Sequence, residues 1–162
     1  MGLDVLTPRG QRTLADEAAA VAIWESQMPG WKYAPTRKET DAVVDAVLLE
    51  NSIVSAIAET KCRYGVTEAT LLGPWRGEWL ITHSKILRLC EVAKALRVPL
   101  FGFLYLVDEK VLLTERIADS RGQIVVQMRT DTTETQETVN GGTATRVNAF
   151  VDMTNARRWR GE

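Results

Sequence analysis

Apolar residues follow two kinds of pattern along this chain, and the longer pattern predicts two helices. Residues 8–27 are rich in Ala with scattered larger apolar residues, a composition suited to a first helix that Pro29 and Gly30 end. Residues 83–97 carry apolar side chains at helical spacing, with most charged side chains off that stripe. They predict an amphipathic second helix that Pro99 ends.

Shorter runs of β-branched and apolar residues predict strands. Residues 43–49 and 53–58 flank the polar segment 50–52, so we expect a hairpin whose second strand is largely buried. After the second helix, residues 100–107 and 111–113 predict a further pair of strands. The pattern therefore predicts an α/β fold.

Two stretches carry weaker signals. Residues 65–79 contain glycine, proline and two tryptophans, which favours a surface loop. The later part of the chain contains the apolar residues 124–126 and then Asn140 and Gly141, a pair suited to a tight hairpin turn at positive φ. We expect a β-rich C-terminal extension over residues 118–162.

Composition limits the classes of protein to consider. With 162 residues, 45% of them hydrophobic, the chain can bury one core, so we expect a single domain over residues 1–162. The formal net charge of −1 means that attraction to nucleic acid must come from a local patch. Two cysteines without metal-ligand spacing suggest free thiols in a reducing cytoplasm. No apolar run approaches the roughly 20 residues that span a bilayer, so we expect no membrane partner.

Three residues of the predicted hairpin suggest a catalytic site. Glu59 and Lys61 lie two apart near the end of the second strand, so their side chains share one face of the sheet. The hairpin turn brings Asp45, on the preceding strand, toward that end. Asp41, four residues earlier, is the alternative to Asp45. Two carboxylates and an ammonium group would then converge.

Such a group suits a hard divalent cation. Two carboxylates are typical protein ligands of Mg²⁺, with Mn²⁺ as an alternative ion. In phosphodiester hydrolysis the ion polarises a phosphoryl oxygen and activates a water, while Lys61 can orient that water or stabilise negative charge.

Asp45 followed by Glu59, Thr60 and Lys61, between a first helix and a later helix, resembles the PD-(D/E)XK nuclease superfamily. The resemblance covers about two thirds of the chain, from about residue 8 to 107. It departs from the motif at one position, because Val44 and not a proline precedes Asp45. It implies a restriction-endonuclease-like α/β fold with a mixed central sheet flanked by helices, in the order αβββαβ. It also implies a DNA nuclease.

Further candidate residues follow from the same resemblance and from helix physics. The first helix looks like that of archaeal Holliday-junction resolvases and related exonucleases, in which a helix glutamate joins the metal site. Glu17 is therefore a fourth candidate, with Glu25 as its competitor, and the Thr60 carbonyl is a third ligand. Ser84 and Lys85 open the second helix, where unpaired backbone N–H groups can bind a DNA phosphate.

Other conspicuous residues have alternative roles. His83 is the only histidine, and without a second histidine or a cysteine nearby we expect no zinc site. Trp75 and Trp79 could stack on unpaired bases or pack in the core or in a lid. The basic residues 157–160 suit a phosphate backbone but could equally be a solvated tail.

The sequence thus predicts a Mg²⁺- or Mn²⁺-dependent DNA nuclease that acts as a homo-oligomer, with a dimer favoured. One alternative is a non-catalytic DNA-binding or assembly domain that keeps the nuclease fold. Another is that the segment after about residue 118 mediates oligomerisation or contact with a phage or repair partner.

Overall fold

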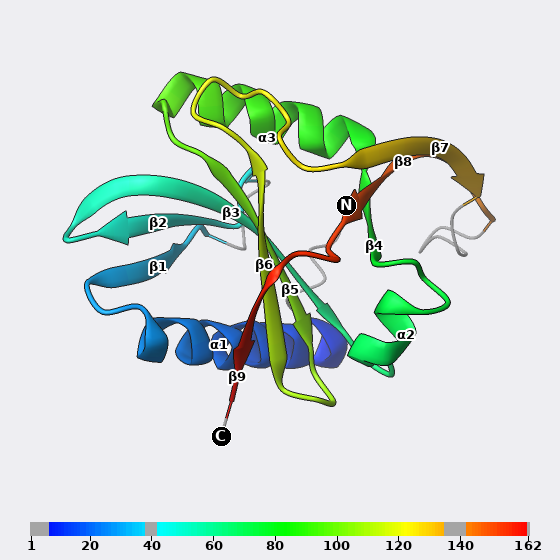
Figure 1. The fold of residues 1–162 in the computed structure, drawn as a ribbon, viewed down its shortest axis with the longest axis horizontal. Helices are drawn as coiled ribbons and strands as arrows, with labels where there is room; N and C mark the ends of the chain where they lie inside the picture. The colour runs from blue at the N-terminus through cyan, green and yellow to red at the C-terminus, as the bar shows by residue number, and fades with distance from the viewer. Residues whose placement is uncertain (1–6, 38–41, 135–141, 162) are drawn as a thin grey trace.

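A computed structural model describes residues 7–37, 42–134 and 142–161 (Figure 1). In chain order its elements are α1 (Pro8–Gln27), β1 (Trp31–Pro35), β2 (Ala46–Glu50), β3 (Ile53–Arg63), α2 (Glu68–Leu72), β4 (Glu78–Thr82), α3 (His83–Leu96), β5 (Leu100–Leu106), β6 (Val111–Ala118), β7 (Met128–Glu134), β8 (Thr145–Asp152) and β9 (Arg157–Arg160). The predicted α/β class is confirmed.

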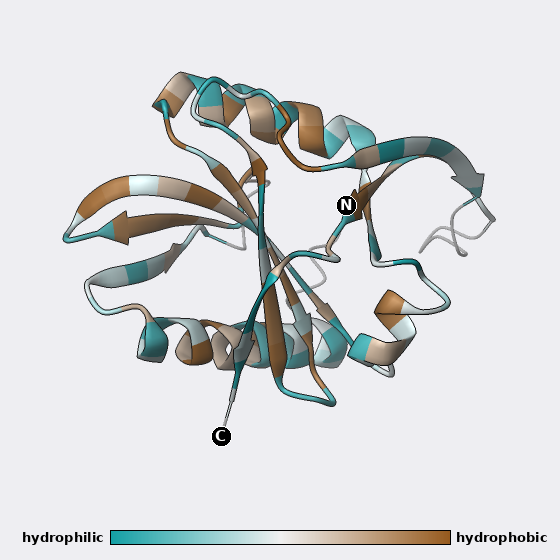
Figure 2. Cartoon of the chain, in the orientation of Figure 1, coloured by the Kyte–Doolittle hydropathy of each residue, from teal (hydrophilic) through white to brown (hydrophobic). Residues whose placement is uncertain are grey.

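A mixed six-stranded sheet forms the centre, in the order β1-β2-β3-β5-β6-β9. β3 and β5 run parallel, and the other neighbouring pairs are antiparallel. α1 packs against one face of this sheet, whereas α3 lies on the other face beside a three-stranded sheet, β4-β8-β7 (Figure 1). The central sheet therefore separates two hydrophobic cores, and Figure 2 shows hydrophobic residues along its strands.

Local sequence explains both long helices. Thr7 accepts a hydrogen bond from the Gly10 N–H at 3.0 Å and so caps α1, which starts with a proline at its first position. α3 buries its apolar stripe, including Ile86 and Leu89, and ends before Arg97 in the left-handed conformation. The predicted bounds of both helices are confirmed to within one residue.

The predicted hairpin is confirmed, with different strand lengths. Asn51 and Ser52 both have positive φ, 49° and 69°, as a tight two-residue turn between strands requires. β3 is 11 residues long, and its register with β2 stops at Ala58, while its register with β5 continues to Arg63. The end of β3 therefore projects beyond β2, and this projecting end carries Glu59 and Lys61.

One sequence-based expectation is wrong in part. The stretch 65–79 is not a loop throughout, because Thr67 caps the short helix α2 and Glu78–Thr82 forms β4, whereas residues 73–77 between them do form turns. Trp79 is only 2% exposed because β4 pairs with the distant strand β8 and turns this side chain into the core. The pattern also gave no sign of β1, which pairs with β2.

The C-terminal segment belongs to both sheets. β8 pairs with β4 and β7, whereas β9 pairs with β6. The expected turn at Asn140 and Gly141 lies outside the described residues, and the 124–126 segment makes only an isolated bridge from Ile124 to Ala118.

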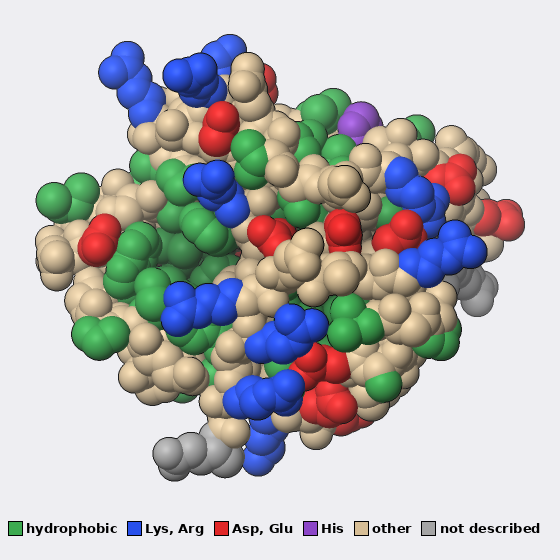
Figure 3. All heavy atoms as spheres, viewed as in Figure 1, with side chains coloured by type: hydrophobic (Ala, Val, Ile, Leu, Met, Phe, Trp, Pro, Cys, Tyr) green, Lys and Arg blue, Asp and Glu red, His purple; other side chains and the backbone are tan. Residues whose placement is uncertain are grey.

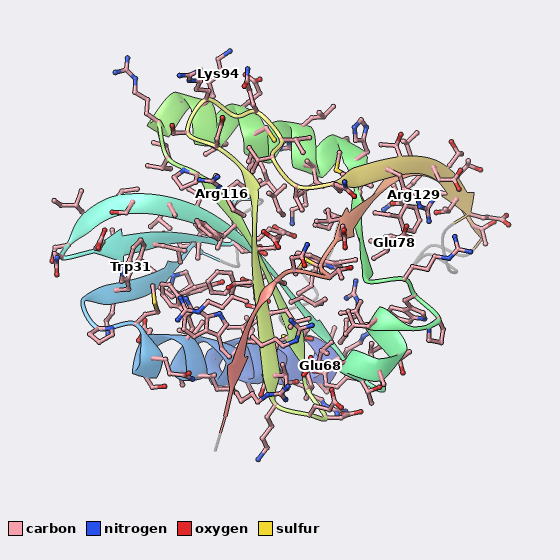
Figure 4. All side chains as sticks on the ribbon, in the orientation of Figure 1. Trp31, Glu68, Glu78, Lys94, Arg116 and Arg129 are labelled. Carbon is pink, nitrogen blue, oxygen red and sulfur yellow. The ribbon has the colours of Figure 1, made fainter. Side chains whose placement is uncertain are left out.

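Residues 157–160, which are three arginines and Trp159, form β9 and are not a solvated tail. Arg158 and Arg160 each lie 2.6 Å from a carboxylate oxygen of Glu68, which Figure 4 labels at α2. Trp159, between them, is 3% exposed. In the described part of the chain, no helix combines the length and apolarity needed to cross a membrane.

Gly102 on β5 offers a test of how tightly β4 packs on the central sheet. A Cβ atom there would lie 2.5 Å from Trp79 Cζ3 and 2.9 Å from Ile117 Cδ1. Gly102→Ala should therefore lower the free energy of unfolding by about 1–3 kcal/mol, measured by urea denaturation. Leu87→Ala, at a side chain 49% exposed on α3, should change it by less than about 0.5 kcal/mol. Equal losses in both variants would contradict this packing.

Candidate active site

The structure brings Asp45, Glu59 and Lys61 together with Lys85. The Lys61 and Lys85 ammonium groups lie 3.3 Å and 2.7 Å from the same oxygen of Glu59, Oε1. Asp45, directly before β2, accepts a hydrogen bond from the Thr60 N–H at 2.8 Å. Two carboxylates and two ammonium groups therefore meet at the projecting end of β3.

A β-bulge sets this arrangement. Glu50 pairs with Ile53 at the turn, and continuing that register would place Asp45 opposite Ala58. The register shifts by one residue between Leu48 and Leu49, so that Ala46 pairs with Ala58. Continued by one residue, the shifted register sets Asp45 opposite Glu59. The extra residue in β3 thus re-aims the strand, as bulges near functional sites commonly do.

Glu59 is the most unusual residue of the group, because its side chain is 0% exposed. Burial raises the pKa of its carboxyl group and the nearby Asp45 adds to the rise, while Lys61 and Lys85 act in the opposite direction. Its second oxygen, Oε2, has no hydrogen-bond partner among the described residues. A buried, partly unsatisfied carboxylate is costly for a fold, which makes Glu59 a candidate functional residue.

Lys61 is held in its charged form. Burial alone would lower the pKa of its ammonium group, but the Glu59 and Asp45 carboxylates outweigh burial and raise it. With 37% of its side chain exposed, Lys61 also reaches the wall of a large cleft. It can donate hydrogen bonds to an anion or to water there.

Thr60 has its side chain on the opposite face of β3, where its Oγ1 lies 2.8 Å from the Tyr33 hydroxyl. Its N–H points to the edge beside Asp45, and in a strand the carbonyl of the same residue points to the same edge. Burial raises the pKa of Tyr33, with Asp45 adding to the rise. Tyr33 was not a candidate from sequence, because the strand that carries it was not predicted.

Glu17 lies on α1 near Cys62 and lines the same cleft as Thr60 and Lys61. Glu17 is half-buried on α1, and its charge helps burial to raise the pKa of Cys62 to about 12. Cys62 belongs to the core beneath α1, whereas Glu59 points toward α3. The competitor Glu25 accepts a hydrogen bond from the Tyr33 N–H at 2.8 Å, so it joins α1 to β1.

The remaining candidates lie at the start of α3 or outside the described residues. Ser84 is exposed in the first turn of α3, and His83 is half-buried at its first position. Lys85 turns its ammonium group toward Glu59. Asp41 lies outside the described residues.

Among the residues that the structure describes, no group of three or more histidine, cysteine or acidic side chains could hold a metal ion. The available donors are the Asp45 and Glu59 carboxylates and the Thr60 carbonyl. This set suits a hard cation such as Mg²⁺, which usually keeps several waters and takes only one or two protein carboxylates.

A cleft of about 1110 Å³ opens beside this group. Its walls come from α1, the projecting end of β3, α2, β4, β7 and β8, and they include Thr60, Lys61 and Trp75. A second hollow, about 370 Å³, is mainly aromatic and apolar; Trp31 and Arg116, labelled in Figure 4, belong to its lining. Figure 3 shows hydrophobic side chains gathered in a hollow on the left of the molecule. The larger cleft alone adjoins the paired charges.

Comparisons of this chain with protein-family models, with curated protein sequences and with solved structures found no match. Its function must therefore be inferred from the chemistry of the residues themselves.

The raised pKa of Glu59 predicts a pH-dependent difference in stability between the wild type and Glu59→Gln. The folded protein binds the Glu59 proton more tightly than the unfolded chain does, so this carboxyl destabilises the fold increasingly as pH rises above its ordinary pKa of 4.5. Glutamine does not ionise. As pH rises above 4.5, the melting temperature of the variant should therefore rise relative to that of the wild type.

Thermal unfolding followed by circular dichroism measures this difference. Glu91→Gln, at an exposed position of α3, is the matched control and should show no such trend. A difference between Glu59→Gln and the wild type that stays constant with pH would contradict a raised pKa at Glu59.

Proposed function

We propose that this protein is a Mg²⁺- or Mn²⁺-dependent nuclease that hydrolyses DNA phosphodiester bonds, with a site of the PD-(D/E)XK kind. The observation that carries the proposal is the convergence of Asp45, Glu59 and Lys61 at the projecting end of β3, with Glu59 fully buried. A structural ion pair alone would not need a second carboxylate beside a buried one.

The donor set fits a divalent cation. Glu59 Oε2 lacks a hydrogen-bond partner in the described residues, and the charge of Asp45 raises the pKa of Glu59, which shows mutual repulsion. A cation would relieve that repulsion. The Lys85 ammonium group, 2.7 Å from Glu59 Oε1, shows that this position attracts positive charge. Asp45, Glu59 and the Thr60 carbonyl would hold the ion.

The bound ion would supply Lewis acidity to a phosphoryl oxygen and would lower the pKa of water. Lys61 supplies the protein's own contribution. Its raised pKa keeps it protonated, so it acts as a hydrogen-bond donor and not as a general base. At the edge of the cleft it orients an attacking water and stabilises the negative charge that develops on the phosphate.

Lys85 has a second, electrostatic role. Its ion pair with Glu59 lowers the pKa of that carboxyl and so favours the ionised form that binds a cation. Glu17 lines the same cleft as Thr60 and Lys61, so it stays a further candidate ligand, approaching from α1.

The order of elements supports the same proposal. α1, β1, β2 and β3 are followed, after the inserted α2 and β4, by α3 and β5. Without the insertion this is the order αβββαβ of a restriction-endonuclease-like core. The parallel pairing of β3 with β5 places α3 as the crossover helix beside Glu59.

Substitution of the central residues should abolish cleavage of DNA. With Mg²⁺ or Mn²⁺, Glu59→Ala and Lys61→Ala should each reduce the rate at least about 100-fold, because each removes charge from the reacting phosphate or its ion. The assay follows labelled linear, nicked, branched and single-stranded DNA on denaturing gels.

Lys94→Ala, in the last turn of α3, is the matched control for loss of a lysine and should keep full activity. Cleavage that persists undiminished in Glu59→Ala or Lys61→Ala would refute the assignment.

A second candidate function is a DNA-binding or assembly domain that keeps this fold without catalysis. The ion pairs of Glu59 with both Lys61 and Lys85 favour it, because they already balance the buried charge without a metal ion. The two functions differ in their binding of metal.

Isothermal titration with Mn²⁺ separates the two. A nuclease site should bind Mn²⁺ in the wild type and bind it at least about ten-fold more weakly in Asp45→Ala, because a carboxylate ligand is lost. Asp41→Ala should behave as the wild type. If Asp41→Ala instead loses the ion, Asp41 is the ligand, and no Mn²⁺ binding to the wild type would favour the non-catalytic domain.

A further inference from the structure

The cleft beside Lys61 combines charge with accessible aromatic rings. Its basic side chains come from three elements: Arg9 of α1, Lys61 and Arg63 of β3, and Arg146 of β8. Trp75, which follows α2, lines the same cleft and is 44% exposed. An exposed aromatic ring offers a face on which a planar ligand group can stack, and arginine side chains can bind anionic groups.

Opposing charges keep this cleft from being strongly basic. Glu17, Glu78 and Glu134 also line it. Glu78 is neutralised by Arg129, whose guanidinium donates to both of its oxygens at 2.7 Å, and Figure 4 shows the two residues side by side. Because duplex DNA is held mainly through its phosphates, this mixed lining gives a duplex little affinity. Binding must then draw on other groups of the nucleic acid.

The bases of an unpaired strand are such groups. In a duplex the base faces are stacked on one another, whereas in a single strand they can stack on aromatic side chains. Trp75 provides an exposed ring, while Tyr64 and Phe150 in the same lining already carry Arg12 at 4.4 Å and Arg129 at 3.9 Å from their ring centroids. Stacking on Trp75 therefore distinguishes single-stranded from paired DNA.

The cleft also joins the aromatic ring to the paired charges. Its volume is about 1110 Å³, and both Trp75 and Lys61 line it. Lys61 lies in this cleft and also in the group with Glu59. A strand held along the cleft would thus lead its phosphates to the carboxylates.

From these observations we infer that the cleft binds single-stranded DNA, with Trp75 stacking on a base and Arg63 contacting the backbone. The inference rests on the proposed nuclease function for its choice of ligand. It adds the substrate class, an unpaired strand, which the carboxylates and lysines do not specify.

Binding of labelled oligonucleotides without metal tests this inference separately from catalysis. In EDTA, the full chain should bind a single strand of about 12 nucleotides at least about ten-fold more tightly than the duplex of the same sequence, by fluorescence anisotropy. Trp75→Leu should weaken single-strand binding about five-fold or more, and Trp75→Phe should restore most of it. Arg63→Gln should weaken it and reduce its salt dependence.

Arg88→Gln, at an exposed position of α3 outside the cleft lining, is the control and should leave binding unchanged. Equal or tighter binding of the duplex, no binding of either DNA, or unchanged binding by Trp75→Leu would overturn the inference. If the single strand is preferred but neither DNA is cut with Mn²⁺, the proposed nuclease function fails while this inference stands.

Discussion

The fully buried carboxyl group of Glu59 is the constraint on which the surrounding arrangement depends. A charge removed from water needs partners, and two lysines from different elements, Lys61 on β3 and Lys85 on α3, supply them. Replacing the group by an apolar residue would be the simpler way to fill this position. A carboxyl group here, with Asp45 close enough to raise its pKa, therefore costs stability that an apolar side chain would not.

The pairing and register of the strands determine which groups surround Glu59. Glu59 lies where the pairing of β3 with β2 has ended but its pairing with β5 continues, so only one edge of the strand is paired there. The bulge between Leu48 and Leu49 sets Asp45 opposite Glu59, and the crossover helix α3 brings Lys85. The end of the β2–β3 pairing, the register shift in β2 and the crossover helix α3 thus all shape the surroundings of Glu59.

Sequence patterns predicted the parts of this arrangement that depend on local order. Strand alternation placed Glu59 and Lys61 on one face, and helical spacing placed Lys85 in the first turn of α3. The bulge left no mark in the hydrophobic pattern, although the predicted approach of Asp45 agrees with the structure. Glu17 was suggested by resemblance alone, and the structure places it in the lining of the same cleft as Lys61.

What the sequence could not reveal depends on contacts between distant residues. β4 looked like part of a loop, because its partner β8 follows only after residues 83–144 and decides that Trp79 is buried. β1 was missed for a related reason: of its five residues only Tyr33 is buried, and pairing with β2 defines them as a strand. Tyr33 was missed with it.

The pairing of β4 with β8 also bears on the biogenesis of the protein. One wall of the cleft consists of β7 and β8, and β8 emerges from the ribosome long after β3 and α3. The residues of the charge group are therefore synthesised well before the cleft beside them can be completed, because that cleft needs the chain as far as residue 152.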